Sequence, residues 1–133
     1  MTAIAISPPN APERSARPFA PSGGAEPAID LVHLSRATDG DESLEAELMA
    51  MFDRQSEKLV VRVKMTDLPR RARADVAHRL RGSALAIGAF AVARAAEAVE
   101  ATLEGEGEAQ AEISALAAAV AVARAAIAEL SKP

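Results

Sequence analysis

The stretch AHRLRGSALAIGAF, from Ala77 to Phe90, decides the fold. An α-helix turns about 100° per residue, so residues three, four and seven apart share a face. On that geometry the apolar face of this segment consists of Val76, Leu80, Ser83, Ala84 and Ile87. The spacing therefore predicts one amphipathic helix over about residues 70–87. Gly88 follows it directly, in the position of a left-handed helix cap.

The opposite face of this helix points outward and carries His78. The residues predicted to lie around it are Arg71, Ala74, Asp75, Arg81, Gly82 and Leu85. A glycine inside a helix costs about 1 kcal/mol relative to alanine, so Gly82 needs an explanation. Either another helix packs closely against it, or another molecule must approach His78 without obstruction. The helical wheel alone does not separate these two explanations.

The run His78, Leu80, Arg81, Gly82 and Ser83, followed by Gly88 and Ala89, resembles the signature of histidine-containing phosphotransfer (HPt) domains. That signature reads H-x-L-K/R-G-S, with G-A a few residues on. The resemblance extends more loosely from about residue 29 to residue 130. Family members usually carry lysine at the position of Arg81, which keeps the positive charge. They often carry a second small polar residue where this chain has Ala84.

The remaining chain divides into a proline-rich arm and four further helical segments. Residues 1–28 hold six of the eight prolines and predict a disordered arm. A short helix over residues 29–37 is predicted to be capped by Asp30. A long helix follows, capped by Asp41 and running to about Met65. Its predicted buried stripe is Leu44, Leu48, Met51, Phe52, Gln55, Leu59 and Val63. Two more helices are predicted over residues 90–103 and 109–130. Their predicted buried stripes are Val92, Ala96, Val99 and Leu103 in the first, and Ile113, Leu116, Val120, Ala123, Ile127 and Leu130 in the second.

Short loops between long helices favour antiparallel neighbours. The fold class predicted for residues 29–133 is therefore all-α: an antiparallel up-down-up-down four-helix bundle with a short extra N-terminal helix. The HPt resemblance implies the same architecture.

Composition narrows the functional classes. The chain has no cysteine and only two histidines, His33 and His78, without metal-ligand spacing, so no metal site and no bound cofactor are expected. The net charge of −4 weighs against nucleic-acid binding. No unbroken apolar run reaches about 18 residues, and no basic-then-apolar leader is present. We therefore expect a cytoplasmic protein that does not bind membranes.

A neutral imidazole is a nucleophile that can form a covalent intermediate. Because the sequence contains no P-loop, we do not expect the chain to load itself from ATP. The resemblance implies instead that Nε2 of His78 accepts a phosphoryl group from an aspartyl phosphate on a receiver domain and passes it to a second receiver. The implied partners are response-regulator receiver domains and a hybrid histidine kinase. The receiver, not this chain, would supply Mg²⁺, and the carrier would be a monomer.

The other motif residues have expected roles around that transfer. Arg81 would neutralise charge on the phosphoryl oxygens. Ser83 would bond back to a carbonyl of the preceding turn, a structural role. The surface expected to contact a partner consists of Gly82, Leu85, Arg79, Arg71 and Ala74. A basic cluster around His78 would speed encounter with acidic receivers. It consists of Arg70, Arg71, Arg73, Arg79 and Arg81.

Other interpretations of the same residues are open. In the first, the bundle binds a receiver or another signalling protein and His78 is never phosphorylated. In the second, the chain is a fragment of a self-loading histidine kinase, which the missing ATP-binding segment argues against. For His33 we expect an ordinary surface or half-buried residue.

Overall fold

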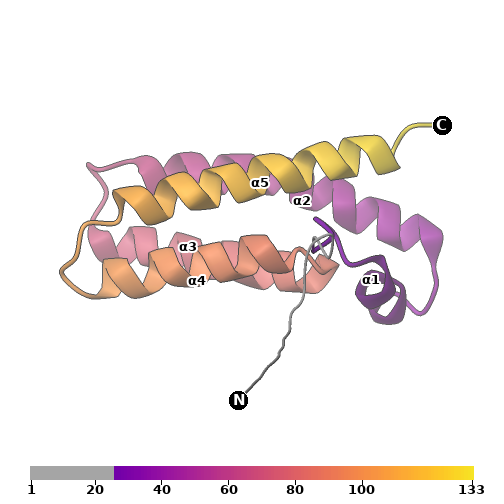
Figure 1. The fold of residues 1–133 in the computed structure, drawn as a ribbon, viewed down its shortest axis with the longest axis horizontal. Coiled ribbons are helices and arrows are strands. Elements are labelled where there is room, and N and C mark those ends of the chain that lie inside the picture. Colours follow the sequence, from indigo (N-terminus) through magenta and orange to yellow (C-terminus); the bar gives the residue numbers. More distant parts are fainter. Residues whose placement is uncertain (1–25) are drawn as a thin grey trace, which may run out of the picture.

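The computed structural model describes residues 26–133, which form five helices and no strand (Figure 1). The helices are α1 (Leu31–Ala37), α2 (Glu42–Lys64), α3 (Arg70–Ile87), α4 (Phe90–Glu104) and α5 (Gln110–Leu130). Each begins and ends within one or two residues of its predicted bounds. Nearly all of the predicted arm lies outside the described residues.

Local sequence signals fix the ends of these helices. The carboxylate of Asp30 accepts a hydrogen bond from the His33 amide at 3.0 Å, and that of Asp41 accepts one from the Leu44 amide at 3.1 Å. Gly88 adopts the left-handed conformation, with φ of +79°, and ends α3 as predicted. All three predicted caps are confirmed.

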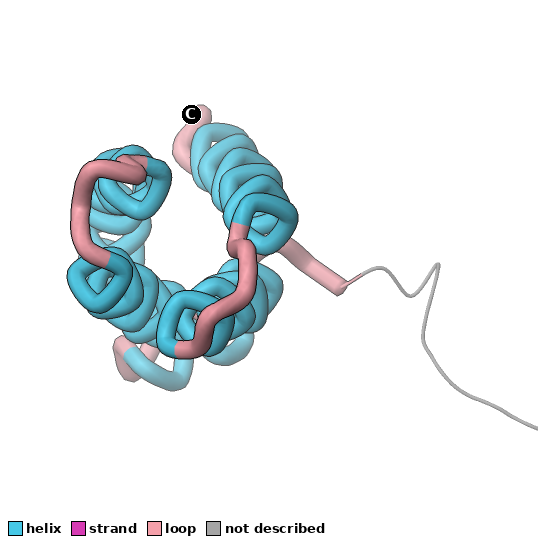
Figure 2. The backbone as a smooth tube through the Cα atoms, turned by 90° about the vertical axis from the view of Figure 1, so that its left-hand side faces the viewer, coloured by secondary structure: helices cyan, strands magenta, loops and turns pink. Residues whose placement is uncertain are grey.

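The four long helices lie side by side around a common core (Figures 1 and 2). Each of α3 and α5 packs against both α2 and α4, and the short α1 packs on α3 and α2. The interface between α3 and α4 is the largest of these, and that between α2 and α5 is the smallest among the long helices. The predicted all-helical class is confirmed.

The buried stripe of α2 differs from the predicted one. Phe52, Leu59 and Val63 are buried, and so are Ser56 and Val60, which the sequence analysis missed. Leu44 and Met51 are 38% and 43% exposed, and Gln55 is exposed as well. Helical geometry puts the centre of the buried face near Ser56, so that Leu44, Met51 and Gln55 fall at its margin.

In α4 and α5 the predicted stripes are buried, apart from Leu130 at the end of α5, which is 45% exposed. By length and composition alone, α5 is long and apolar enough to cross a membrane, and 28% of the apolar 18-residue window within it is buried inside the bundle. Core helices of soluble proteins and membrane spans both meet this criterion, so it does not decide between them.

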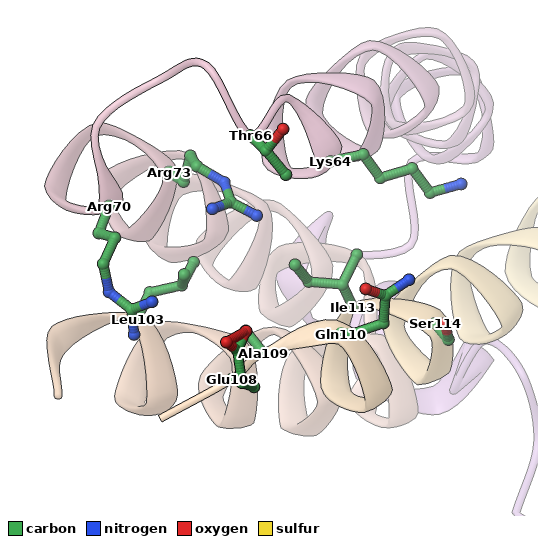
Figure 3. A pocket seen from close by; sticks show the side chains of 10 residues that line it. All are labelled: Lys64, Thr66, Arg70, Arg73, Leu103, Glu108, Ala109, Gln110, Ile113 and Ser114. Carbon is green, nitrogen blue, oxygen red and sulfur yellow. The ribbon is translucent and has the colours of Figure 1, made fainter. Parts of the chain in front are cut away.

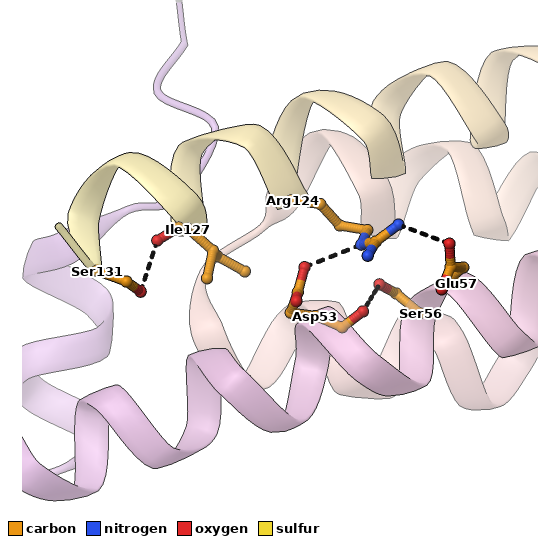
Figure 4. Close-up of polar contacts among 6 residues, drawn as sticks. All are labelled: Asp53, Ser56, Glu57, Arg124, Ile127 and Ser131. Atoms are coloured by element: carbon orange, nitrogen blue, oxygen red, sulfur yellow. Dashed lines mark hydrogen bonds and ion pairs between the residues drawn. The ribbon is translucent and has the colours of Figure 1, made fainter.

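An ion-pair group joins α5 to α2 (Figure 4). Nε of Arg124 donates to Oδ1 of Asp53 at 2.9 Å, and Nη1 donates to Oε2 of Glu57 at 3.1 Å. The hydrogen bond that Arg124 donates to Asp53 raises the pKa of the guanidinium, against a smaller opposing effect of burial, and the charges of both carboxylates raise it further. These contacts connect the two long helices that share the smallest interface.

The segment that begins α1 is fastened to the turn after α3. The Asp30 amide donates to the Gly88 carbonyl at 2.9 Å. A Cβ atom at Gly88 would lie 2.8 Å from the Asp30 carbonyl oxygen, so the close approach requires glycine, as does the positive φ. This contact fixes α1 beside the last turn of α3.

Candidate functional site

His78 lies in the middle of α3, and its side chain is 62% exposed. The outward position predicted from the helical wheel is therefore confirmed. The backbone around it is regular helix within the largest helix–helix interface of the bundle. The imidazole is thus exposed to solvent on a rigid support.

Glu100 of α4 holds the inner nitrogen of this ring. Nδ1 of His78 lies 3.1 Å from Oε2 of Glu100 and 3.3 Å from Oε1, and the Glu100 side chain is only 18% exposed. An ionised carboxylate can only accept hydrogen bonds, so Nδ1 carries the proton in this pair. In a neutral ring Nε2 is then unprotonated, and its lone pair is available for reaction.

Sequence reasoning missed this partner. Six glutamates fall between residues 97 and 112, and their spacing alone does not single one of them out. The orientation of α4 against α3 decides which one reaches His78. The one indication in the sequence is that Glu100 lies beside the predicted buried stripe of the helix that follows the one carrying His78.

Gly82 follows His78 by one turn on the exposed side of α3. It is exposed, and a Cβ atom built on it would meet no atom within 4 Å outside its own helix. The explanation by close helix packing is therefore wrong for the described part of the chain. The space beside the imidazole is open.

The other predicted site residues differ in their exposure to solvent. Arg71 and Arg79 are exposed, Leu85 is 39% exposed, and Arg81 is half-buried. Ala74 was predicted to lie on the exposed face and is only 2% exposed, which corrects that prediction. It lies about 40° from His78 on the wheel, and its small side chain sits at the junction between α3 and α4.

Ser83 is half-buried, as its position at the edge of the stripe suggests. Within residues 26–133 its hydroxyl makes no hydrogen bond to a carbonyl of the preceding turn, so the predicted back-bond is not found. The structural role expected for Gly88 is confirmed by its left-handed conformation and its contact with Asp30.

Two arginines of the predicted basic cluster, Arg70 and Arg73, bind backbone carbonyls away from His78. Nη2 of Arg70 donates to the carbonyls of Thr102, Gly105 and Gly107 at 2.9, 3.2 and 2.7 Å. Arg73 is 8% exposed, and its Nε donates to the Val63 carbonyl at 2.8 Å. Both guanidinium groups satisfy carbonyls at the ends of neighbouring helices, a common role for basic side chains. The basic cluster therefore reduces to Arg71, Arg79 and Arg81.

A groove of about 620 Å³ lies between α3 and α4. It is lined by Arg70, Arg71, Ala74, Asp75, Leu103, Glu104 and Gly105. Ala74 and Asp75 precede His78 by one helical turn, so the groove begins next to the histidine. Between residues 26 and 133 no group of three histidine, aspartate or glutamate side chains is arranged to hold a metal ion.

His33 occupies a different environment. Its Nε2 lies 2.9 Å from the Leu85 carbonyl, and its ring meets that of Phe90 edge-on at 5.1 Å. It is half-buried, within the range expected from the sequence. Within residues 26–133 Nε2 of His78 has no hydrogen-bond partner, whereas Nε2 of His33 is paired with the Leu85 carbonyl.

No protein-family model, curated protein or solved structure matches the chain.

Proposed function

We propose that this protein is a phosphorelay carrier of the HPt type. In this proposal His78 accepts a phosphoryl group from an aspartyl phosphate on a receiver domain and passes it to a second receiver. The observation that carries the proposal is an exposed imidazole held through Nδ1 by Glu100, beside the open position at Gly82. The motif resemblance around His78 adds to it, and so does the all-helical fold of residues 26–133. The proposal includes an up-down-up-down order of the four long helices.

The chemistry follows from the tautomer. The Nε2 lone pair attacks phosphorus, the bond between phosphorus and the aspartyl oxygen breaks, and its electron pair returns to the receiver carboxylate. Nδ1 keeps its proton throughout, so the phosphorylated ring carries a positive charge. The Glu100 carboxylate at 3.1 Å stabilises that charge and fixes the ring orientation. No proton has to be removed by a general base.

The surroundings of His78 suit the approach of a protein donor. Gly82 leaves room for the receiver's phosphorylated loop, which must bring the reacting atoms within about 3.5 Å. Arg81, half-buried one turn beyond His78, supplies positive charge near the phosphoryl oxygens. Leu85, Arg71 and Arg79 extend the contact surface along α3. The receiver would bring the Mg²⁺ that this chemistry uses.

The decisive experiment incubates the full chain with a panel of phosphorylated receiver domains and follows transfer of labelled phosphate. We expect label on the wild type and on His33→Ala, and none on His78→Ala. The label should be stable to alkali and labile to acid, as a phosphoramidate is. The partner would be identified by the receiver that transfers fastest.

Label that persists on His78→Ala would overturn the proposal. The alternative function is a helical interaction module that binds a receiver without being phosphorylated. It is favoured if a receiver binds the wild type and His78→Ala equally and transfers no phosphate to either.

A further inference from the structure

A second concave site lies at the end of the bundle where α2 ends and α3 and α5 begin. It is a cavity of about 390 Å³, within the usual range for small-molecule sites. Its polar lining includes Lys64, Thr66, Arg70, Arg73, Gln110 and Ser114, and Leu103 and Ile113 contribute apolar wall (Figure 3). It shares only Arg70 and Leu103 with the groove beside His78.

The central feature of this cavity is the guanidinium of Arg73. The residue is only 8% exposed, and Nε is occupied by the Val63 carbonyl. Among residues 26–133 its two Nη groups have no hydrogen-bond or ion-pair partner. Figure 3 shows the guanidinium pointing into the space that the other labelled side chains enclose. The Nη atoms are not among the buried atoms that lack a partner, so they are reached from the open space of the cavity. An anion bound there would meet two donors that no residue between 26 and 133 occupies.

The local field is also positive. Three cationic side chains and one acidic side chain, Glu108, line the cavity. The first turns of α3 and α5 border it, and neither Pro69 nor Ala109 caps its helix with a side-chain hydrogen bond. Uncapped helix N-termini present free N–H groups and a partial positive charge.

We propose that this cavity binds a small molecule through an oxyanion head group, a phosphate or a carboxylate. The two Nη atoms of Arg73 form the planar fork that binds such a group in a bidentate manner. Thr66 and Ser114 contribute hydroxyl groups to the lining, and Leu103 and Ile113 contact the apolar part of the ligand. This site does not involve His78 and does not depend on the phosphorelay proposal.

The test uses the full chain with inorganic phosphate and, separately, sodium acetate as probes, with NaCl keeping the ionic strength constant. We expect the preferred probe to raise Tm by about 5 °C at tenfold excess over its Kd. For phosphate, broadening of its ³¹P resonance on addition of the protein reports binding directly. Stabilisation by one probe alone distinguishes a phosphate site from a carboxylate site.

A matched pair of variants separates the cavity from general salt effects, which phosphate also produces. Ser114→Asp puts a negative charge into the lining, whereas Ala115→Asp puts the same charge on the exposed surface one residue along α5. Both positions are exposed, so both variants are expected to fold. Ser114→Asp is expected to lose binding and Ala115→Asp to retain it.

Arg73→Lys tests the fork while keeping the charge, and we expect at least tenfold weaker binding. His78→Ala is expected to bind like the wild type. The proposal is overturned if neither probe binds the wild type, or if Ser114→Asp binds as well as Ala115→Asp.

Discussion

The two histidines of this protein differ in which ring nitrogen is available. His33 uses Nε2 to contact the Leu85 carbonyl, and its ring packs edge-on against Phe90. His78 uses Nδ1 to contact Glu100, and its ring is mostly exposed, which leaves Nε2 facing solvent. The imidazole of His33 therefore joins α1 to the end of α3, whereas the imidazole of His78 exposes its Nε2 atom to solvent. The difference lies in the partner and in the space beside the ring.

The largest expected effect comes from closing the space beside His78. Gly82→Gln places a long side chain where nothing now lies within 4 Å of a Cβ atom. We expect receiver-to-His78 transfer to fall at least a hundredfold with Tm unchanged, because small displacements of reacting atoms cost about that much. Gly82→Ala should lose less and be equally or more stable.

The matched control is Ala86→Gln, which adds the same side chain to an exposed position one turn further along α3. It should transfer normally. If Gly82→Gln unfolds, or folds and transfers at the wild-type rate, open space is not what distinguishes His78.

The second effect concerns the nitrogen that Glu100 holds. Glu100→Ala frees Nδ1, so the proton distributes between both ring nitrogens and the ring can rotate. We expect transfer to fall about ten- to a hundredfold. ¹⁵N spectra of the His78 ring should show a smaller share of the Nδ1–H tautomer. A purely structural role for Glu100 would leave that share unchanged.

Glu97→Ala, an exposed change one turn earlier on α4, is the control and should leave both measurements unchanged. Glu100→Gln keeps an acceptor for Nδ1–H but removes the charge. It should restore the tautomer while transferring more slowly than the wild type.

Much of this arrangement could be predicted from the sequence, and the failures have a common cause. Periodicity located the helices, and the wheel correctly placed His78 and Gly82 outward. It placed Ala74 outward as well, because a wheel treats a helix face as uniform and does not include the neighbouring α4. The hydrogen-bond partners of Arg70 and Arg73 are carbonyls at the ends of α4 and α2, and which carbonyls lie within reach depends on how the helices pack. Glu100 was missed for the same reason: contacts between helices depend on their relative rotation.

The third effect tests the fastening role of His33. His33→Ala removes the contact to the Leu85 carbonyl and the edge-on contact with Phe90. We expect Tm to fall by about 5 °C with transfer to His78 unchanged, since these contacts are worth roughly 1 kcal/mol together. His78→Ala should show the reverse: Tm unchanged and transfer abolished. Equal Tm values for the two variants would show that His33 stabilises the fold no more than His78 does.

The smallest effect involves the segment just before α1. Glu26 forms a two-point ion pair with Arg94 of α4, one contact of which measures 3.0 Å. The hydrogen bond from Arg94 lowers the pKa of Glu26, against a smaller opposing effect of burial. A lowered folded-state pKa contributes stability above the unfolded pKa, and this is lost as pH falls through the folded value.

Glu26→Gln should therefore lower Tm by about 2 °C at pH 7, a small change because both side chains are substantially exposed. The difference from the wild type should shrink as pH falls through the lowered folded-state pKa of Glu26, because the wild-type carboxyl then becomes protonated as well. A series of thermal melts from pH 7 downwards measures it. A difference that does not shrink with falling pH would show that the charge of Glu26 is not its cause.

His78 and Glu100 belong to two consecutive helices joined at Gly88 and Ala89, and they lie 22 positions apart in the chain. The imidazole and the carboxylate that holds it therefore belong to one helical hairpin, residues 70–104. The helices α2 and α5 cover its apolar back and contribute neither of the two residues. The contact between ring and carboxylate thus depends directly on how α3 packs against α4, and only indirectly on the two helices that complete the bundle.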